Sequence, residues 1–429
     1  MDVKPGYKQT ETGIIPEDWD APFLGEIFTF KNGLNKAKKF FGYGTPIVNY
    51  MDIYGKRGLF AHDLQGRVSL SKQELKTFEV RRGDVFFTRT SETAEEVGIT
   101  SVMLDVSEDT VFSGFVLRAR PKDDSLDDQF KKYCFSTSVV RKQITSQSTE
   151  TTRALTNGRY LSTVVIARPP KPEQEAIAEA LSHADNLIES LKQLTAKKRH
   201  LKQGLMQELL TGKKRLPGFE VKPGYKQTEV GIIPEDWEVS RLGEVVSRFA
   251  NGGTPSTKHE AYWRGNIPWI TGADILNQRV AVIRRFITKD AVRNSSTNII
   301  SKGNLLLVSR TGVGKLAISP CDIAISQDFT GIYTKHERLS TEYLFRFLDL
   351  NQSILMNQNQ GTSILGVTRE TLSALTIFFP PTTSEQTAIS IILSDMDAEI
   401  ATLETKLAKF RQIKQGMMQE LLTGRIRLI

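Results

Sequence analysis

The chain lacks the features that mark several classes of protein. It has only two cysteines, Cys134 and Cys321, far apart in its 429 residues, which excludes a disulfide framework and makes a cytoplasmic setting the default expectation. No apolar run approaches the roughly 18 residues of a membrane-spanning helix, and the first residues lack the apolar segment of a secretory signal. Five scattered histidines, no two at ligand spacing, argue against a structural zinc site.

The charge of the chain indicates a polyanionic partner only weakly. The sequence has 57 basic and 49 acidic residues, a formal net charge of +8. Many basic proteins bind nothing acidic, so charge alone leaves nucleic acid as one option among several. With 39% apolar residues, the chain has enough material for the cores of two or three domains.

An internal repeat organises the whole sequence. The motifs KPGYKQTE and GIIPEDW in residues 4–19 recur in residues 222–237, and the offset from residue 4 to residue 222 is 218. KQGLMQELLTG in residues 202–212 recurs as KQGMMQELLTG in residues 414–424, at an offset of 212. Near-identical flanks around divergent middles indicate a fixed frame that carries two different inserts.

Each copy of the frame ends in a long predicted helix. Proline pairs follow two short apolar stretches, residues 164–166 and 376–379, which we expect to be strands. Pro172 suits the first turn of the first helix, and Thr383 with Gln386 fits a capping box at the start of the second. The sequence Thr-Gly predicts a glycine cap at the end of both helices.

Both helical segments carry an apolar seam that repeats every 3.5 residues on average, as in a coiled coil. The predicted packing positions are Ile177, Leu181, Ile188, Leu191 and Leu205 in the first helix and Ile389, Leu393, Ile400, Leu403, Phe410 and Met417 in the second. The first seam is expected to continue through Thr195, Lys198 and Leu201. We expect the two helices to pair with each other, antiparallel, as a spacer between the inserts. Packing on the inserts, or pairing between chains, is the alternative.

The motifs of common catalytic sites fail when they are tested. Residues 309–316 resemble a P-loop, but Ser309 replaces the leading glycine and Leu316 stands where Ser or Thr should hold magnesium. No G-x-G-x-x-G follows a predicted strand, and the Pro-Pro pairs lack the flanking residues of an amino-methyltransferase motif. Asp63, Glu74 and Lys76 have the loose spacing of a metal-dependent nuclease, which is common by chance. The residues therefore indicate a reader and a scaffold.

Both inserts mix short apolar runs with turn residues, which predicts compact, strand-rich α+β domains. Base recognition needs forked donors such as Arg, Asn and Gln, and phosphate contact needs Lys, Ser and Thr. The candidate DNA contacts in the first insert are Lys36, Lys38, Lys39, Tyr43, Arg57, Arg89, Arg153 and Arg159. Those in the second insert are Thr254, Ser256, Lys258, Trp263, Arg279, Arg310, Lys315, Gln360 and Thr362. Trp19 and Trp237 belong to the frame and are predicted to be core residues.

The layout resembles the specificity subunit of type I restriction–modification systems over nearly the whole chain. Two GIIPEDW motifs each lead into a variable insert, which leaves through Pro-Pro and Glu-Gln into a long helix ending in LLTG. The resemblance implies an α+β fold with two target recognition domains joined by two conserved antiparallel coiled-coil helices, and a pseudo-two-fold internal repeat. It places the recognition domains at residues 1–170 and 213–382, and the spacer helices at residues 171–212 and 383–429.

The resemblance also implies a function and partners. Each recognition domain would read one half of a bipartite, asymmetric site in double-stranded DNA, while the helices set the gap and dock the partners. The subunit itself would be non-catalytic, with no metal or cofactor of its own. Two modification subunits with S-adenosylmethionine would methylate adenine N6, and two motor-nuclease subunits using ATP and Mg²⁺ would complete a cytoplasmic complex that defends against foreign DNA.

Two alternatives stay open at this point. The chain could be an independent DNA-binding or architectural protein with two modules. It could also be a self-contained nuclease that acts through Asp63, Glu74 and Lys76. The sequence leaves open which bases are read, which insert reads which half, and how many base pairs separate the halves.

Overall fold

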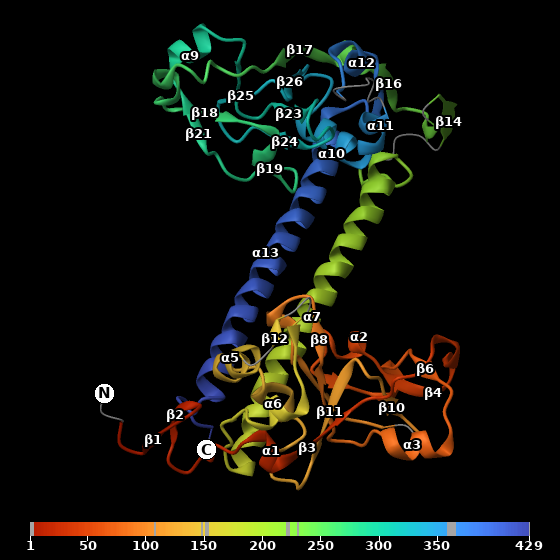
Figure 1. Ribbon diagram of the computed structural model, residues 1–429. Helices are drawn as coiled ribbons and strands as arrows, with labels where there is room; N and C mark the ends of the chain where they lie inside the picture. The colour runs from red at the N-terminus through yellow and green to blue at the C-terminus, as the bar shows by residue number, and fades with distance from the viewer. Residues whose placement is uncertain are drawn as a thin grey trace. The chain divides into compact units, whose positions relative to one another are not determined.

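The chain divides into two compact units, and neither is a continuous half of the sequence. The computed structural model describes residues 4–106, 109–146, 149–150, 154–219, 224–229, 231–357 and 366–428. Unit 1 comprises Met1–Lys192 and Thr405–Ile429, and unit 2 comprises Gln193–Glu404. Each unit therefore contains one insert and a segment of both long helices, α7 (Lys171–Leu210) and α13 (Thr383–Leu421), as Figure 1 shows.

Unit 1 is built on strands and short helices. The strands are β1 (Tyr7–Thr10), β2 (Gly13–Pro16), β3 (Phe28–Asn32), β4 (Phe41–Val48), β5 (Gly58–Leu59), β6 (Arg67–Val68), β7 (Val85–Thr88), β8 (Thr90–Ser91), β9 (Thr100–Met103), β10 (Val111–Phe112), β11 (Val116–Pro121), β12 (Thr149–Glu150) and β13 (Ala154–Leu155). The helices are α1 (Leu24–Ile27), α2 (Tyr50–Ile53), α3 (Lys72–Phe78), α4 (Lys131–Cys134), α5 (Ser138–Ser146) and α6 (Gly158–Ser162), with 3₁₀ turns η1 (Lys38–Phe40), η2 (Ala61–Asp63) and η3 (Ala94–Glu96).

Unit 2 has a corresponding set of elements. The strands are β14 (Tyr225–Thr228), β15 (Gly231–Pro234), β16 (Glu238–Arg241), β17 (Val246–Asn251), β18 (Ile267–Ile270), β19 (Ile275–Leu276), β20 (Arg279–Val280), β21 (Arg285–Ile287), β22 (Asn298–Ile300), β23 (Leu305–Val308), β24 (Leu316–Ile318), β25 (Ile323–Ile325), β26 (Phe329–Thr334) and β27 (Thr376–Phe379). The helices are α8 (Leu242–Val245), α9 (Lys289–Arg293), α10 (Thr341–Leu350), α11 (Gln352–Asn357) and α12 (Arg369–Ala374), with η4 (Glu260–Trp263) and η5 (Gly272–Asp274).

The sheets of the two units follow the same plan. The order β3-β11-β7-β9 in unit 1 corresponds to β17-β26-β23-β24 in unit 2, and unit 1 adds β5 at the edge. A second sheet contains β10-β4-β6 in unit 1 and β21-β18-β25-β22 in unit 2. In this second sheet β4 pairs parallel with β10, as β18 does with β25. The structure therefore confirms the internal repeat and the strand-rich α+β class.

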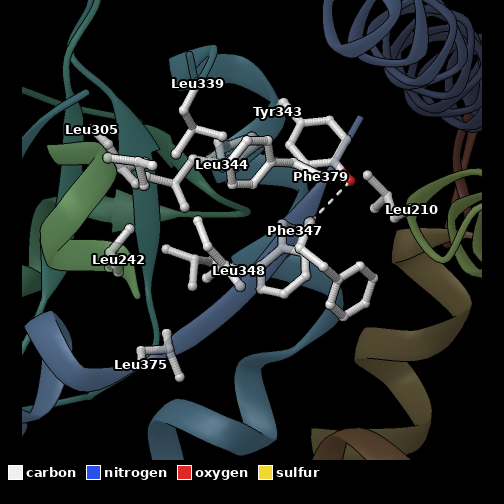
Figure 2. Packing of buried hydrophobic residues seen from close by; sticks show 14 of the residues in the cluster. Leu210, Leu242, Leu305, Leu339, Tyr343, Leu344, Phe347, Leu348, Leu375 and Phe379 are labelled. Atoms are coloured by element: carbon white, nitrogen blue, oxygen red, sulfur yellow. Dashed lines mark hydrogen bonds between the residues drawn. The ribbon is translucent and has the colours of Figure 1, made fainter. Parts of the chain in front are cut away.

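The ends of the long helices are part of the cores of the units. Figure 2 shows Leu210, the last residue of α7, beside Tyr343, Phe347 and Phe379 in the largest apolar cluster of unit 2. The hydroxyl of Tyr343 donates to the Phe378 carbonyl at 3.4 Å inside this cluster. Because the helix end is buried in the core, it is fixed to the sheet of the unit and does not lie on its surface.

The two long helices pack together in antiparallel orientation. The ion pairs between them are Lys198–Glu399 and Lys202–Asp397 in unit 2 and Lys414–Asp185 in unit 1. Residue numbers in these pairs rise along one helix as they fall along the other. The predicted antiparallel, intramolecular pairing is therefore confirmed.

Burial along the helices follows the heptad. The predicted positions Ile177, Leu181, Ile188, Ile389, Leu393, Ile400 and Leu403 are buried, and Leu191, Leu205, Phe410 and Met417 are half-buried. The expectation for Leu201 is wrong, because its side chain is 52% exposed. The next seam position after Lys198 is four residues on, at Lys202, which pairs with Asp397 at 2.6 Å.

The repeated motifs of the frame meet in a charged cluster in unit 2, which we call the Arg215 clasp. The Arg215 guanidinium donates to Glu385 at 2.6 and 2.8 Å and to Asp236 at 2.8 and 3.0 Å. It also lies over the Trp237 ring, 5.9 Å from the centroid. The clasp joins the residues after α7 to the Glu-Asp-Trp motif and to the start of α13.

Unit 1 repeats this arrangement with the other ends of the frame. Arg427 donates to Glu173 at 2.7 and 2.8 Å and to Asp18 at 3.0 and 2.7 Å. The indole Nε1 of Trp19 also donates to Glu173, at 2.8 Å. Trp19 and Trp237 are both buried, which confirms their predicted place in the core.

The glutamine of the Glu-Gln motif attaches each helix to its unit. Gln386 accepts from the Ser340 amide at 2.7 Å and donates to the carbonyls of Arg338 and Pro380, both at 2.9 Å. The predicted capping box of Thr383 with Gln386 is therefore wrong, because the Gln386 amide is fully engaged elsewhere. The hydroxyl that caps this end belongs to Thr382, which accepts from the Glu385 amide at 3.4 Å.

Other predictions of local structure have mixed outcomes. Gly212 and Gly424 have φ of +69° and +68°, so both helices end in the left-handed glycine cap. Residues 376–379 form β27 as expected. Residues 164–166 form only an isolated antiparallel bridge, Val165 with Phe23. The Ile166 amide donates to the Pro22 carbonyl at 3.3 Å, but Pro22 has no amide hydrogen to donate in return, so the ladder is interrupted.

Candidate nucleic-acid interface

In unit 1, one exposed group of candidates lies on η1 and the start of β4. Lys38 and Lys39 are exposed on η1, and the Tyr43 ring is 56% exposed on β4. Gly42 and Gly44 flank this tyrosine at φ of +104° and +93°, a backbone conformation that favours glycine. The arrangement presents two ammonium groups and one aromatic ring to solvent, a combination suited to phosphates and bases.

Two other candidates of unit 1 are engaged inside the protein. Lys36 binds Glu74 at 2.6 Å and the Ser69 carbonyl at 2.9 Å. Arg57 donates to Ser136 at 2.9 Å, with Tyr133 beneath its guanidinium. Internal groups thus engage both side chains, an acidic one for Lys36 and neutral ones for Arg57, and their donors are less available to a ligand than those of the lysines on η1.

Arg89 leaves the end of the buried strand β7, as the sequence predicts. Its amide donates to the Phe115 carbonyl at 3.2 Å, and its Nη1 donates to the Gly114 carbonyl at 3.3 Å. Phe115 is 64% exposed and lines a hollow of about 360 Å³ together with Tyr50, Met51 and Tyr54. Arg159 is exposed on α6.

In unit 2 one group of candidates belongs to a loop that is held by two tryptophans. The indole of Trp263 donates to the Ser256 carbonyl at 3.2 Å, and the indole of Trp269 donates to the Gly253 carbonyl at 3.1 Å. Thr254, Ser256 and Lys258 are exposed on the same loop. These bonds hold the loop against β18 and η4.

Arg285 joins this group, although the sequence analysis did not select it. It lies opposite Trp269 in the β18–β21 pair, and its guanidinium is near both indole rings. Only the pairing of β18 with β21 brings Arg285 to the tryptophans, and the composition of the sequence does not reveal this pairing.

In the turn that resembles a P-loop, the lysine binds the backbone of the protein itself. Gly312 and Gly314 have φ of +88° and +95°, and Lys315 turns back to donate to the Gly272 carbonyl at 3.1 Å. Arg310 is exposed at the end of β23, and its amide donates to the Asp328 carbonyl at 3.3 Å. The register of the strands aligns Arg89 with Ser309, whose amide donates to the Asp328 carbonyl at 2.7 Å as the Arg89 amide does to that of Phe115. Arg310 therefore lies one residue further along the chain than Arg89 does.

Arg279 is exposed on β20. It lines a hollow of about 1130 Å³ between the β19–β20 hairpin, α10 and the segments of α7 and α13 in this unit. The remaining candidates Arg153, Gln360 and Thr362 lie outside the described residues.

Comparison with known proteins decides the family. A family model described as the type I restriction modification DNA specificity domain matches residues 16–197 and 234–412. The chain belongs to this specificity family. The MjaVIII type I restriction enzyme specificity subunit of Methanocaldococcus jannaschii is 28% identical over 443 residues, 98% of this chain and 96% of that protein. The MjaIX specificity subunit of the same organism is 34% identical over 184 residues, 42% of each chain.

A solved structure has the same fold. The crystal structure of the type I restriction–modification S subunit from M. genitalium matches with a TM-score of 0.59 and covers 98% of both chains at 14% identity. With the family model and the curated relatives, the chain is a type I DNA specificity subunit with two target recognition domains. Specificity subunits are the non-catalytic component of the enzyme complex.

The nuclease alternative finds no support in this specificity subunit. Glu74 caps α3 through the Ser71 amide and pairs with Lys36, and these hydrogen bonds lower the pKa of Glu74 to about 2. Asp63 instead lies 3.6 Å from Lys56. Across the described ranges, no cluster of three or more His, Cys, Asp or Glu could hold a metal ion. The same ranges contain no helix long and apolar enough to cross a membrane.

Proposed function

We propose that each unit of this specificity subunit reads one half of a bipartite, asymmetric DNA site. One observation carries the proposal: the two units share a frame and sheet order, while their exposed polar residues differ. A shared frame would bring both units to DNA in the same way. Different side chains at the ends of the same strands would then select different bases.

The proposed contacts are the exposed and half-buried candidates of both inserts. In unit 1 the exposed ones are Lys38, Lys39, Tyr43 and Arg159, and Arg89 is half-buried. In unit 2 the exposed ones are Thr254, Ser256, Lys258, Arg279 and Arg310, and Trp263 is half-buried. Arg153, Gln360 and Thr362 remain proposals on sequence grounds. Lys36, Arg57 and Lys315 have internal partners, and we assign them to shaping the loops from which the other residues reach DNA.

The long helices would set the distance between the half-sites. We take residues 1–170 and 213–382 as the recognition domains, and residues 171–212 and 383–429 as the spacer helices. Both helices contribute segments to both units, so any change in their length would act on both at once. The exposed sides of the helices would dock the modification subunits.

The chemistry would belong to the partners. Two modification subunits with S-adenosylmethionine would methylate adenine N6 in each half-site, and two motor-nuclease subunits with ATP and Mg²⁺ would cut unmodified DNA. We place the assembled complex in the cytoplasm, where its DNA substrate would lie.

Methylation mapping tests the proposal. The modification subunit is expressed in a host with and without this chain, and N6-methyladenine is mapped across the genome. We expect a new bipartite motif that appears only when both proteins are present. An unchanged adenine methylation pattern would refute the proposal, and tight specific binding by the lone chain would favour an independent DNA-binding protein.

A further inference from the structure

Arg285 of unit 2 is held by two tryptophans. It lies on the edge strand β21, directly opposite Trp269 of β18. Its guanidinium carbon is 5.8 Å from the ring centroid of Trp263 and 5.7 Å from that of Trp269. The two rings meet edge to face with centroids 5.0 Å apart. This is the geometry of a cation–π contact with two rings.

The rings that hold Arg285 are themselves fixed. Both indole nitrogens donate to backbone carbonyls of the 253–256 loop, at 3.2 Å from Trp263 and 3.1 Å from Trp269. Trp269 is 2% exposed, so its orientation is set by the core. A guanidinium against such rings loses little further freedom when it binds a ligand.

The donors of Arg285 are uncommitted. Within the described residues, no hydrogen bond or ion pair engages its side chain, which is exposed. The neighbouring Arg284 is different, because it donates to Asp274 at 2.8 Å and to the Ala273 carbonyl at 3.3 Å. Arg264, which is exposed and follows Trp263 in the sequence, donates to Glu260 at 2.8 Å. Arg285 therefore presents a fork of N–H groups that the fold does not use.

Unit 1 has no equivalent of this arginine. The pairing of Pro46 with Arg67 corresponds to that of Pro268 with Phe286, which aligns Gly66 with Arg285. A Cβ atom at Gly66 would lie 2.2 Å from the Asn49 side chain. Any side chain at this position of unit 1 would require Asn49 to move, and the residue there is glycine, so the arginine belongs to unit 2 alone.

We propose that Arg285 is a specificity-determining residue that recognises a guanine in the half-site read by unit 2. The inference rests on the proposed function. A forked guanidinium matches the paired O6 and N7 acceptors of guanine in the major groove. Phosphate contacts carry no sequence information and are needed by both units, whereas a feature confined to one unit suits the reading of one half-site.

The test uses the full-length chain assembled with its modification subunits and a duplex that contains the mapped site. Each guanine of the unit 2 half-site is changed in turn to adenine or to 7-deazaguanine, which lacks the N7 acceptor. At one position we expect the change to adenine to weaken binding by the unsubstituted complex about 5- to 150-fold. 7-Deazaguanine should weaken binding at the same position, and Arg285→Ala should abolish both effects.

Two further variants distinguish recognition of guanine by the guanidinium from a general effect of positive charge. Arg285→Lys keeps the charge without the fork and should also lose the discrimination. Arg264→Ala, which removes a charge already paired with Glu260, should keep it. The inference is overturned if the half-site read by unit 2 contains no guanine, or if Arg285→Ala distinguishes guanine from adenine as well as Arg264→Ala does. It is also overturned if Arg285→Ala weakens binding to all sequences equally and makes binding less dependent on salt. If the unsubstituted complex binds no specific site, the proposed function itself fails.

Discussion

Replacing Arg215 by alanine removes the centre of the Arg215 clasp. The Glu385 side chain is 2% exposed and that of Arg215 is 11% exposed, so the pair is buried. Removing one partner of a buried ion pair leaves an uncompensated charge and costs about 3–5 kcal/mol of folding free energy. We expect a loss of this size in the unfolding of unit 2.

The corresponding variant in unit 1 should be less affected. Glu173 is as buried as Glu385, but Arg427 is 24% exposed and Asp18 is 52% exposed, so water can solvate Asp18 and reach the space that Arg427 leaves. Glu173 also keeps the hydrogen bond from Trp19. In the clasp of unit 2, Trp237 Nε1 has no hydrogen-bond partner among the described residues and offers no such help. Arg215→Ala should therefore cost more than Arg427→Ala.

The loss should depend on pH with a defined sign. Burial raises the pKa of Glu385 above its ordinary value of 4.5, and the hydrogen bonds from Arg215 oppose this rise. Without Arg215 the pKa rises further, so the folded state binds a proton that the unfolded state releases. A group of this kind destabilises the fold as the pH rises through its folded pKa. The deficit of Arg215→Ala should shrink as the pH falls toward 4.5.

Urea denaturation followed by tryptophan fluorescence at pH 7.5 and pH 5 measures these effects. The double variant Arg215→Leu/Glu385→Gln should be more stable than Arg215→Ala, because it buries no isolated carboxylate at residue 385. The reasoning is refuted if Arg215→Ala unfolds within 1 kcal/mol of the unsubstituted chain. It is also refuted if the double variant loses as much stability as the single variants Arg215→Leu and Glu385→Gln do when their losses are added.

Two further predictions concern the helices. Leu393→Ala should cost about 2–5 kcal/mol in urea denaturation because Leu393 is fully buried, while Ile391→Ala, two residues away and 54% exposed, should cost under 1 kcal/mol; equal losses would contradict the burial pattern. Inserting seven residues between 194 and 195 and between 404 and 405 adds about 10.5 Å of helix. Methylation mapping should then show a gap longer by about 3 base pairs with unchanged half-sites. Altered half-site sequences would contradict the spacer role.

The frame could be predicted from the sequence because it occurs twice. The repeat located both helices, both buried tryptophans and both glycine caps. The clasp itself could not be predicted, because Arg215 and Glu385 are separated by 170 residues and nothing local pairs them. The sequence predicts Leu201 at the helix–helix contact, whereas the structure places Lys202 there and leaves Leu201 exposed. An error of one residue is enough for this, because neighbouring side chains of a helix point to different faces.

The candidate site was harder to predict for a related reason. Lys36 and Lys38 are two residues apart and chemically identical, yet one is paired with Glu74 and the other is exposed. Composition identifies which residues can contact DNA, while tertiary contacts decide which are free to do so. Arg285 could not be selected from the sequence either, because only the register of two strands brings it to Trp269.

The most direct test of the account is the replacement of residues 20–168 by the first insert of another specificity subunit, followed by mapping of N6-methyladenine in the presence of the modification subunit. The account predicts a new sequence in one half-site, with the other half-site and the gap unchanged. Changes in both half-sites, or in neither, would contradict the claim that each unit reads one half.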